Sequence, residues 1–219
     1  MNKGRLIVFE GADGTGKTTQ AKLFFNFLQK KKIPAVLTSF PRYDSLWGKM
    51  IRRYLDGEFG STASVSPYLA SLIYAGDRLI AKDEIKKWLD SGKFVICDRY
   101  VASNIAHQGA KISDKTKKEK FINWIEELEY KENQIPKEDL VILLTMPGNV
   151  AQKLMRGRVK DIHEQDSSYQ ARVANIFEEL AEKRPNWVAV SNVEDSKLRD
   201  LKEIHLEIVK ILDSKSIFA

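Results

Sequence analysis

A short glycine-rich stretch near the start of the sequence has the residue types and spacing needed to hold a chain of phosphates. Residues 11–18 read GADGTGKT and match the pattern G-x-x-x-x-G-K-[ST]. Glycines in this pattern let backbone N–H groups turn inward and bind an anion at the start of a helix. We expect the Lys17 ammonium to contact the β- and γ-phosphates of a nucleoside triphosphate and the Thr18 hydroxyl to ligate Mg²⁺. The residues predicted to bind the triphosphate are Gly11, Gly14, Thr15, Gly16, Lys17, Thr18 and Thr19.

An acid and a base follow a second apolar run. The segment FVICDRY ends with Asp98 and Arg99 before its final tyrosine. In a parallel sheet that carries a phosphate loop, a carboxylate at this place lies near the metal, although many strand-ending acids only cap the next helix. We expect Asp98 to ligate Mg²⁺ and the forked guanidinium of Arg99 to hold a second phosphate.

Two further pairs of side chains are candidates for binding a second reactant. Arg42 and Tyr43, in FPRYDS, follow a predicted strand and so lie at the edge of the sheet where α/β proteins bind ligands. Tyr74 and Arg78, in YAGDR, are four residues apart and share one face of a helix, where they can stack on a base and hydrogen-bond its edge. The alternatives are that Arg42 and Arg78 are ordinary surface arginines and that Tyr74 belongs to the core.

A polar, basic segment, MRGRVKDIHEQDSSY, lies between two helical patterns and has the composition of a mobile flap. Its Arg156 and Arg158 are candidates to close over transferring phosphates, and the alternative is a solvated basic loop. The histidines, His107, His163 and His205, are scattered along the sequence and indicate no metal site.

Alternating strands and helices are expected to position these residues. Short apolar runs alternate with longer helical patterns, which is typical of β-α units that build a parallel sheet. The predicted strands are Leu6–Phe9, Ala35–Ser39, Phe94–Cys97, Leu140–Leu144 and Trp187–Val190. Two apolar helical stripes are Phe121, Trp124, Ile125 and Leu128, and then Leu198, Leu201, Ile204, Ile208 and Ile211. We predict a single α/β domain over residues 1–219, with a five-stranded parallel sheet flanked by helices and a flap at about 156–165.

Composition narrows the class of protein. The 219 residues are 43% hydrophobic and 30% charged, and no apolar run approaches the roughly 20 residues that span a bilayer. The formal charge of +6 is modest for this length, so a solvated surface with a polyphosphate site is favoured over nucleic-acid binding. The single cysteine, Cys97, cannot form an internal disulfide, and the first residues lead straight into a strand without a signal peptide. We therefore expect a cytoplasmic protein.

Together the motifs resemble those of the thymidylate kinase family, P-loop enzymes that phosphorylate dTMP with ATP. FEGADGTGKTTQ, FPRY, YAGDR, DRYVASN and IPKEDLVILL occur in the family's order over essentially the whole chain. The resemblance implies a P-loop NTPase-type fold with a short flexible lid, Mg²⁺ as cofactor and ATP as co-substrate. It also implies dTMP as acceptor and a homodimer, while the composition predicts no membrane or nucleic-acid partner.

The resemblance further implies roles for individual residues. Lys17, Asp13, Arg99 and the lid residues Arg156 and Arg158 would act in catalysis. The dTMP-binding residues would be Asp13 at the sugar 3′-hydroxyl, Phe40 lining the base pocket, Tyr74 stacked on thymine, Arg78 at its O4 edge and Asn104 at the base. Arg99 would hold the monophosphate with Tyr43 nearby, Glu164 would lie close to the acceptor sugar and phosphate, His107 would lie near the sugar, and Arg42 would also belong to the substrate site.

Two positions depart from the family pattern. One branch of the family has an arginine directly after the loop aspartate, where this sequence has Gly14. The other branch has glycine there and arginines in the lid, which fits Arg156 and Arg158. Some members have a tyrosine that blocks a ribose 2′-hydroxyl where this sequence has His107, so discrimination against ribonucleotides is expected to rest elsewhere or to be less strict.

The chemistry leaves rival functions to compare. Phosphoryl transfer needs alignment and charge neutralisation rather than covalent catalysis, which fits a sequence without a Ser-His-Asp or Cys-His signature. One rival is a kinase for another nucleoside monophosphate or for a deoxynucleoside, whose hydroxyl would need a general-base carboxylate. Another is a nonenzymatic P-loop ATP-binding protein, although the N-K-x-D motif of a GTPase is missing from the sequence.

Overall fold

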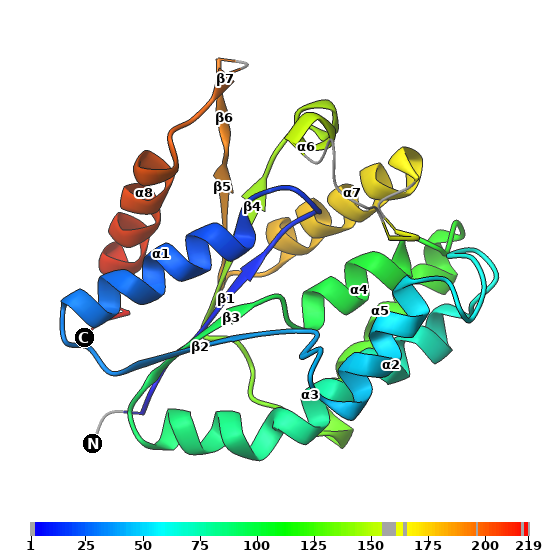
Figure 1. The fold of residues 1–219 in the computed structure, drawn as a ribbon, viewed down its shortest axis with the longest axis horizontal. Helices are drawn as coiled ribbons and strands as arrows, with labels where there is room; N and C mark the ends of the chain where they lie inside the picture. The colour runs from blue at the N-terminus through cyan, green and yellow to red at the C-terminus, as the bar shows by residue number, and fades with distance from the viewer. Residues whose placement is uncertain (1–2, 155–160, 164–165, 196, 216, 219) are drawn as a thin grey trace.

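The chain folds into a central parallel sheet with helices on both faces (Figure 1). The computed structural model describes residues 3–154, 161–163, 166–195, 197–215 and 217–218. The sheet order is β2-β3-β1-β4-β5, and a separate antiparallel pair joins β6 to β7. The strands are β1 (Leu6–Glu10), β2 (Ala35–Ser39), β3 (Phe94–Asp98), β4 (Leu140–Thr145), β5 (Trp187–Ser191), β6 (Val193–Glu194) and β7 (Lys197–Leu198). The five predicted strands and the α/β class are confirmed.

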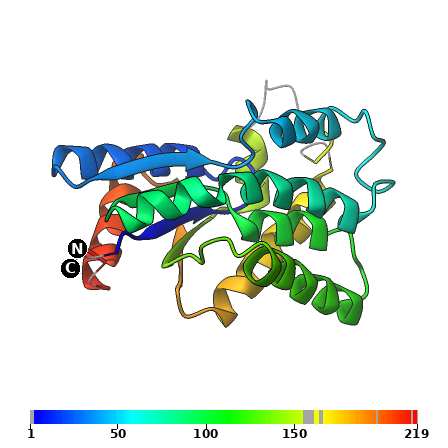
Figure 2. The same cartoon turned by 90° about the horizontal axis from the view of Figure 1, so that it is seen from below.

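Helices cover the two faces of the sheet unequally. The helices are α1 (Lys17–Lys30), α2 (Leu46–Leu55), α3 (Pro67–Asp90), α4 (Val101–Gly109), α5 (Lys115–Glu126), the π-helix η1 (Glu127–Glu132), α6 (Gly148–Leu154), α7 (Ser167–Lys183) and α8 (Leu201–Ser214). Helices α1 and α8 pack on one face, and α3, α4 and α7 pack on the other (Figures 1 and 2). In the described part of the chain, no helix is both long and apolar enough to cross a membrane.

The central strand explains why the sequence shows apolar runs rather than alternation. All of β1 is fully buried, and it pairs with β3 and β4 at once, so that Ile7 lies opposite both Ile96 and Leu140. Ile7 packs with the α1 and α8 side, whereas Val8 packs with the α3, α4 and α7 side. Because both faces are covered by helices, both sets of side chains must be apolar.

The predicted stripe on α5 needs one correction. Phe121 and Ile125 are fully buried as predicted, but the next buried position is Glu129 and not Leu128, which is only partly buried. The reason is that α5 passes into the π-helix η1, whose wider turn rotates the following side chains around the helix axis. A carboxylate thereby occupies a position that the pattern assigned to an apolar side chain.

The predicted stripe of the last helix also needs correction at its start. Leu198 is half exposed and belongs to β7, in the hairpin that follows the last sheet strand. Helix α8 begins at Leu201, after Asp200, whose side chain accepts a hydrogen bond from the backbone N–H of Lys202 at 2.8 Å. This capping interaction, and not the start of the apolar pattern, determines where the helix begins.

Candidate active site

The loop between β1 and α1 has a backbone that only glycine adopts easily. Gly11, Gly14 and Gly16 have φ angles of +145°, +82° and +78°, in the region that side chains with a Cβ rarely occupy. A Cβ on Gly11 would lie 2.4 Å from the carbonyl oxygen of Leu144 in β4. The three glycines thus allow the loop to turn tightly over the sheet edge and to place α1 directly behind it, as the sequence pattern predicted.

Side chains hold this loop in shape from two directions. The Lys17 ammonium donates to the carbonyl oxygen of Ala12 at 2.6 Å, and the Thr15 hydroxyl donates to the same oxygen at 2.9 Å. From beyond β5, the Asn192 amide donates to the carbonyl oxygen of Thr15 at 2.5 Å. Burial, together with the positive charge of Arg99, lowers the pKa of Lys17 to about 8. Lys17 is therefore mostly cationic at neutral pH and close to its titration point.

The two residues predicted to hold Mg²⁺ lie together. The Thr18 hydroxyl donates to Asp98 Oδ2 at 2.5 Å. The other carboxylate oxygen, Asp98 Oδ1, is buried and has no hydrogen-bond partner among the described residues. A hydroxyl and a carboxylate are hard oxygen ligands of the kind that Mg²⁺ uses when it bridges to phosphates. The donor set at the end of β3 therefore fits this ion.

Arg99 joins the phosphate loop to a neighbouring pocket. One end of its guanidinium, Nη2, forms an ion pair with Asp13 of the loop, and Nη1 donates to the Ser103 hydroxyl at 3.3 Å. The same Nη1 lies 3.5 Å from His107 Nε2. Burial alone would raise the pKa of Asp13, but the nearby charges, that of Arg99 foremost, together with the hydrogen bond from Gln170 outweigh it and hold this pKa well below its ordinary value. Asp13 is therefore an anion in the site.

A buried carboxylate that the sequence did not single out supports Arg99. Glu10, at the end of β1, accepts hydrogen bonds from the backbone N–H of Tyr100 at 2.8 Å and of Ser103 at 3.1 Å, and from the Ser103 hydroxyl at 2.6 Å. Burial raises the pKa of this carboxyl. The contacts fix the first turn of α4, while Arg99 itself has φ +67°. The only sequence signal was an acid at the end of an apolar strand.

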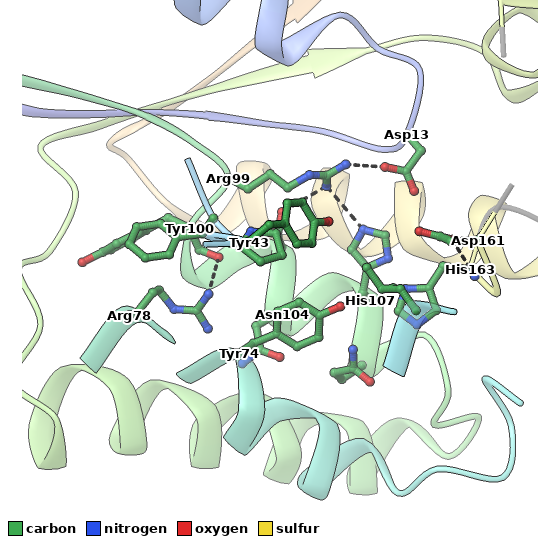
Figure 3. A pocket seen from close by; sticks show the side chains of 15 residues that line it. Asp13, Tyr43, Tyr74, Arg78, Arg99, Tyr100, Asn104, His107, Asp161 and His163 are labelled. Carbon is green, nitrogen blue, oxygen red and sulfur yellow. Dashed lines mark hydrogen bonds and ion pairs between the residues drawn. The ribbon is translucent and has the colours of Figure 1, made fainter. Parts of the chain in front are cut away.

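Beside the loop lies a partly enclosed pocket that combines aromatic walls with a few polar and charged side chains, as small-molecule sites do. Figure 3 shows Asp13 and Arg99 at one end of it, and Arg78, Tyr74 and Asn104 toward the opposite end. The residues that line it are Asp13, Phe40, Pro41, Tyr43, Leu55, Tyr74, Arg78, Arg99, Tyr100, Ser103, Asn104, His107, Gln108, Asp161 and His163. Eight residues predicted to bind substrate are among them: Asp13, Phe40, Tyr43, Tyr74, Arg78, Arg99, Asn104 and His107.

Arg78 is one of the most buried charged side chains of the protein. It is 2% exposed, so the alternative of an ordinary surface arginine is wrong. Its Nε donates to Glu129 Oε1 at 3.0 Å, and its Nη1 donates to the carbonyl oxygen of Tyr100 at 3.3 Å. Asn104, nearby, donates from Nδ2 to the carbonyl oxygen of Ser71 at 3.2 Å. These bonds hold both polar side chains at the pocket wall (Figure 3).

Arg42 has a different environment from the other predicted substrate residues. Its side chain bonds Asp77 through Nε at 3.4 Å and through Nη2 to the backbone oxygen at 3.1 Å, and its backbone N–H donates to Asp77 Oδ2 at 2.7 Å. Arg42 does not line the pocket, although its neighbours Pro41 and Tyr43 do. In this structure Arg42 fastens the turn after β2 to α3.

Two of the histidines are not scattered in space. The rings of His107 and His163 stack at 5.3 Å between centroids with an angle of 15° between their planes. His163 Nε2 lies 2.9 Å from the Tyr54 hydroxyl, which also accepts from the Lys111 ammonium at 2.7 Å. Burial lowers the pKa of His107 to about 4 and that of His163 well below its ordinary value. The two neutral rings form one wall of the pocket (Figure 3).

The predicted lid is described only in part. Arg156, Arg158 and Glu164 lie outside the described residues. The described part of this segment is bound to the end of α2, because the Ile162 N–H donates to the Leu55 carbonyl oxygen at 3.2 Å. Behind it, the Gln170 amide of α7 donates to the carbonyl oxygen of His163 and to Asp13 Oδ2, both at 3.0 Å.

Comparison with known proteins shows which family has a similar sequence and a similar fold. The family model described as thymidylate kinase matches residues 9–204. A probable thymidylate kinase of Pyrococcus horikoshii is 35% identical over 215 residues, covering 96% of each chain, and one of Methanocaldococcus jannaschii is 35% identical over 216 residues, covering 97% of each. The solved thymidylate kinase of Candida albicans superposes with a TM-score of 0.80 at 27% identity, covering 99% of this chain and 94% of that one.

Proposed function

Since this chain belongs to the thymidylate kinase family and transfers a phosphoryl group from ATP to dTMP, we propose that the transfer takes place between the glycine-rich loop and the adjoining pocket, with Mg²⁺, in the synthesis of dTTP. The observation that carries this assignment is the ion pair between Arg99 and Asp13. It joins the wall of the pocket to the loop, so a phosphate held at Arg99 adjoins the phosphates held by the loop.

ATP binds at the glycine-rich loop. The inward backbone N–H groups of residues 11–16 and the start of α1 receive its phosphates, and Lys17 exchanges its bond to the Ala12 carbonyl for bonds to the β- and γ-phosphates. Thr18 and Asp98 hold Mg²⁺, which when bound neutralises charge on the phosphates. Thr19, in the first turn of α1, lies within the same phosphate-facing end of the helix.

dTMP binds in the pocket with its monophosphate at Arg99 and its base at the opposite end. Tyr74 stacks on the thymine ring, and Arg78 and Asn104 hydrogen-bond its edge. Asp13 accepts from the sugar 3′-hydroxyl, and the stacked rings of His107 and His163 pack against the sugar. The lengthwise separation of Arg99 from Arg78 in the pocket supports this orientation (Figure 3).

The reaction needs no strong general base from the protein. The acceptor oxygen belongs to a phosphate that is already ionised at neutral pH, so catalysis consists of bringing two anions together and neutralising the charge that builds up between them. Lys17 and Arg99 supply two of the required cations from opposite sides of the transferring group. We propose that Arg156 and Arg158 supply further positive charge from the lid and that Glu164 lies near the acceptor sugar and phosphate.

A panel of acceptors tests the assignment. With ATP and Mg²⁺, dTMP is expected to give a higher kcat/KM than dUMP, UMP, CMP, AMP or thymidine, measured by coupled detection of ADP. Chelation of Mg²⁺ with EDTA is expected to stop turnover, and excess Mg²⁺ to restore it. Preferential phosphorylation of thymidine would identify a deoxynucleoside kinase instead. Tight ATP binding without turnover of any acceptor would identify a nonenzymatic ATP-binding protein.

We also propose that the protein is a homodimer that pairs through α3. Four large apolar side chains of this helix, Leu69, Leu72, Leu79 and Ile80, are 56%, 44%, 39% and 52% exposed. Their spacing puts them on one face of the helix. The two exposed pairs lie on either side of Gly76, where Trp47 of α2 packs against the helix. Exposed apolar side chains of this kind support association with an identical copy.

Substitution of Leu72 by glutamate is expected to dissociate the dimer, because the charge would be buried among the apolar side chains of the interface. Sedimentation velocity should give twice the 25.1 kDa chain mass for the unmodified protein and 25.1 kDa for the variant. Leu206→Glu is the matched control, since Leu206 is 57% exposed on α8, on the opposite face of the sheet. A Leu72→Glu protein that remains dimeric would place the interface elsewhere.

A further inference from the structure

Glu129 is a buried carboxylate that the phosphoryl-transfer chemistry does not require. It is 0% exposed on the π-helix η1 and takes the position of an apolar side chain in the stripe of α5. A charge in this place is costly unless it is paired and hydrogen-bonded. The groups that contact Glu129 therefore indicate its role.

One carboxylate oxygen of Glu129 contacts both side chains that face the base. Glu129 Oε1 accepts from Arg78 through Nε at 3.0 Å and through Nη2, and it lies 3.4 Å from Asn104 Nδ2, which donates to it. An arginine has five N–H donors. Two are directed to Glu129 and one to the Tyr100 carbonyl, so two remain for a ligand in the pocket.

The same contact decides which way the Asn104 amide faces. Its Nδ2 lies between two acceptors, Glu129 Oε1 at 3.4 Å and the Ser71 carbonyl oxygen at 3.2 Å. A flipped amide would bring its oxygen against a carboxylate and a carbonyl, which repel it. Asn104 Oδ1 is consequently turned away from them, and it is buried without a hydrogen-bond partner among the described residues.

We propose that Glu129 determines base specificity by positioning: it directs Arg78 as a donor and Asn104 Oδ1 as an acceptor toward the base, a pattern that matches thymine and opposes cytosine. Thymine presents the O4 acceptor and the N3–H donor, which meet Arg78 and Asn104 respectively. Cytosine presents an amino donor and an N3 acceptor at the same places, so both contacts become repulsive. The inference rests on the proposed binding of the base at Arg78 and Asn104.

The charge of the pair supports the same assignment. Burial alone would lower the pKa of Arg78, but Glu129 outweighs it, and the pKa lies above its ordinary value. Arg78 is thus a permanent cation whose charge is balanced by a carboxylate in direct contact. A neutral base edge needs oriented hydrogen-bond donors rather than net charge, and a balanced pair supplies them without attracting the phosphate of dTMP to the wrong end of the pocket.

Glu129→Gln is the decisive variant, because it keeps the shape of the side chain and lets the Asn104 amide flip. We expect kcat/KM for dTMP and for dUMP to fall together by about tenfold or more, and the ratio of dTMP to dCMP to fall at least tenfold, the scale of one well-formed base contact. The KM for ATP should change less than about twofold, since the loop is untouched. dUMP is included because it has the hydrogen-bonding edge of thymine without the methyl group.

Glu127→Gln is the matched control, the same substitution two residues earlier, where Glu127 forms an exposed pair with Lys131. It should leave all ratios unchanged. An equal loss for dTMP, dUMP and dCMP in Glu129→Gln would overturn the proposal and leave Glu129 a structural counterion. If Glu129→Gln does not fold, Asn104→Ala is measured in its place. A retained preference of Asn104→Ala for dTMP over dCMP would overturn the proposal. Unmodified enzyme that fails to phosphorylate dTMP would instead overturn the proposed function.

Discussion

Replacing Lys17 with alanine is expected to lower kcat for dTMP phosphorylation by about a thousandfold or more, the scale on which one cation at the transferring phosphate contributes. The folded state should survive, since the hydrogen bond of the Lys17 ammonium goes to a loop carbonyl and, among the residues that the structure describes, none goes to a buried carboxylate. Circular dichroism and thermal melting would check the fold, and a coupled ADP assay would measure turnover. Lys22→Ala, on an exposed position of the same helix, is the control. Full activity in Lys17→Ala would reject the assigned role.

The role of Lys17 can be tested a second time through the pH dependence of kcat/KM for ATP. Burial and Arg99 lower its pKa to about 8 in the free protein. Below that pH the amine is protonated and can pair with phosphate, and above it the amine is neutral. The value of kcat/KM for ATP, which reports on the free enzyme, should therefore fall as pH rises through about 8. A profile that stays flat to pH 10 would show that Lys17 is not the group that binds.

Replacing Arg78 with alanine is expected to weaken dTMP binding by about 100-fold, because charge-assisted hydrogen bonds to the base are lost. ATP binding, measured separately by calorimetry, should change little, since Arg78 lies at the far end of the pocket from the loop (Figure 3). The substitution also leaves Glu129 buried without its partner, which should lower the free energy of unfolding by about 3–5 kcal/mol. For a chain of this length the melting temperature should then fall by roughly 6–20 °C.

A double variant separates the two effects of Arg78. Arg78→Met combined with Glu129→Gln removes both buried charges and keeps similar volumes, so it should recover much of the lost stability without recovering dTMP binding. Arg53→Ala is the control for the loss of an arginine, because Arg53 is exposed and its pair with Glu58 should contribute less than about 1 kcal/mol. Equal weakening of ATP and dTMP by Arg78→Ala would contradict a role at the base.

The sequence was sufficient for those parts of the fold and site that rest on local chemistry. The glycines at 11, 14 and 16 require left-handed backbone, and buried parallel strands require unbroken apolar runs, so both could be recognised from residue type and spacing. Asp98 and Thr18 could be paired because the ends of neighbouring parallel strands meet at one edge of the sheet.

The rest depends on polar contacts between residues that are distant along the chain. Nothing near Glu129 signals that a helix will widen there and turn its carboxylate inward to Arg78, 51 residues earlier. The stacking of His107 on His163 depends on how the segment after residue 160 folds back over the pocket. For Arg42 the local signal was present but incomplete. Its place after a strand fits a ligand site, whereas its side chain is bonded to Asp77 of α3.

The position of β1 in the sheet has a consequence for how the protein is made. β1 is the first strand along the chain, but its partners are Val95 in β3 and Leu140 in β4, and the loop that follows it is fastened by Asn192. A ribosome adds about 5–20 residues per second, so roughly 10–40 seconds pass between synthesis of this loop and synthesis of its last support. Until β3 has been synthesised, about halfway through that interval, this apolar strand has no neighbour and is exposed to chaperones and to aggregation. The nucleotide-binding loop is thus translated early and assembled late.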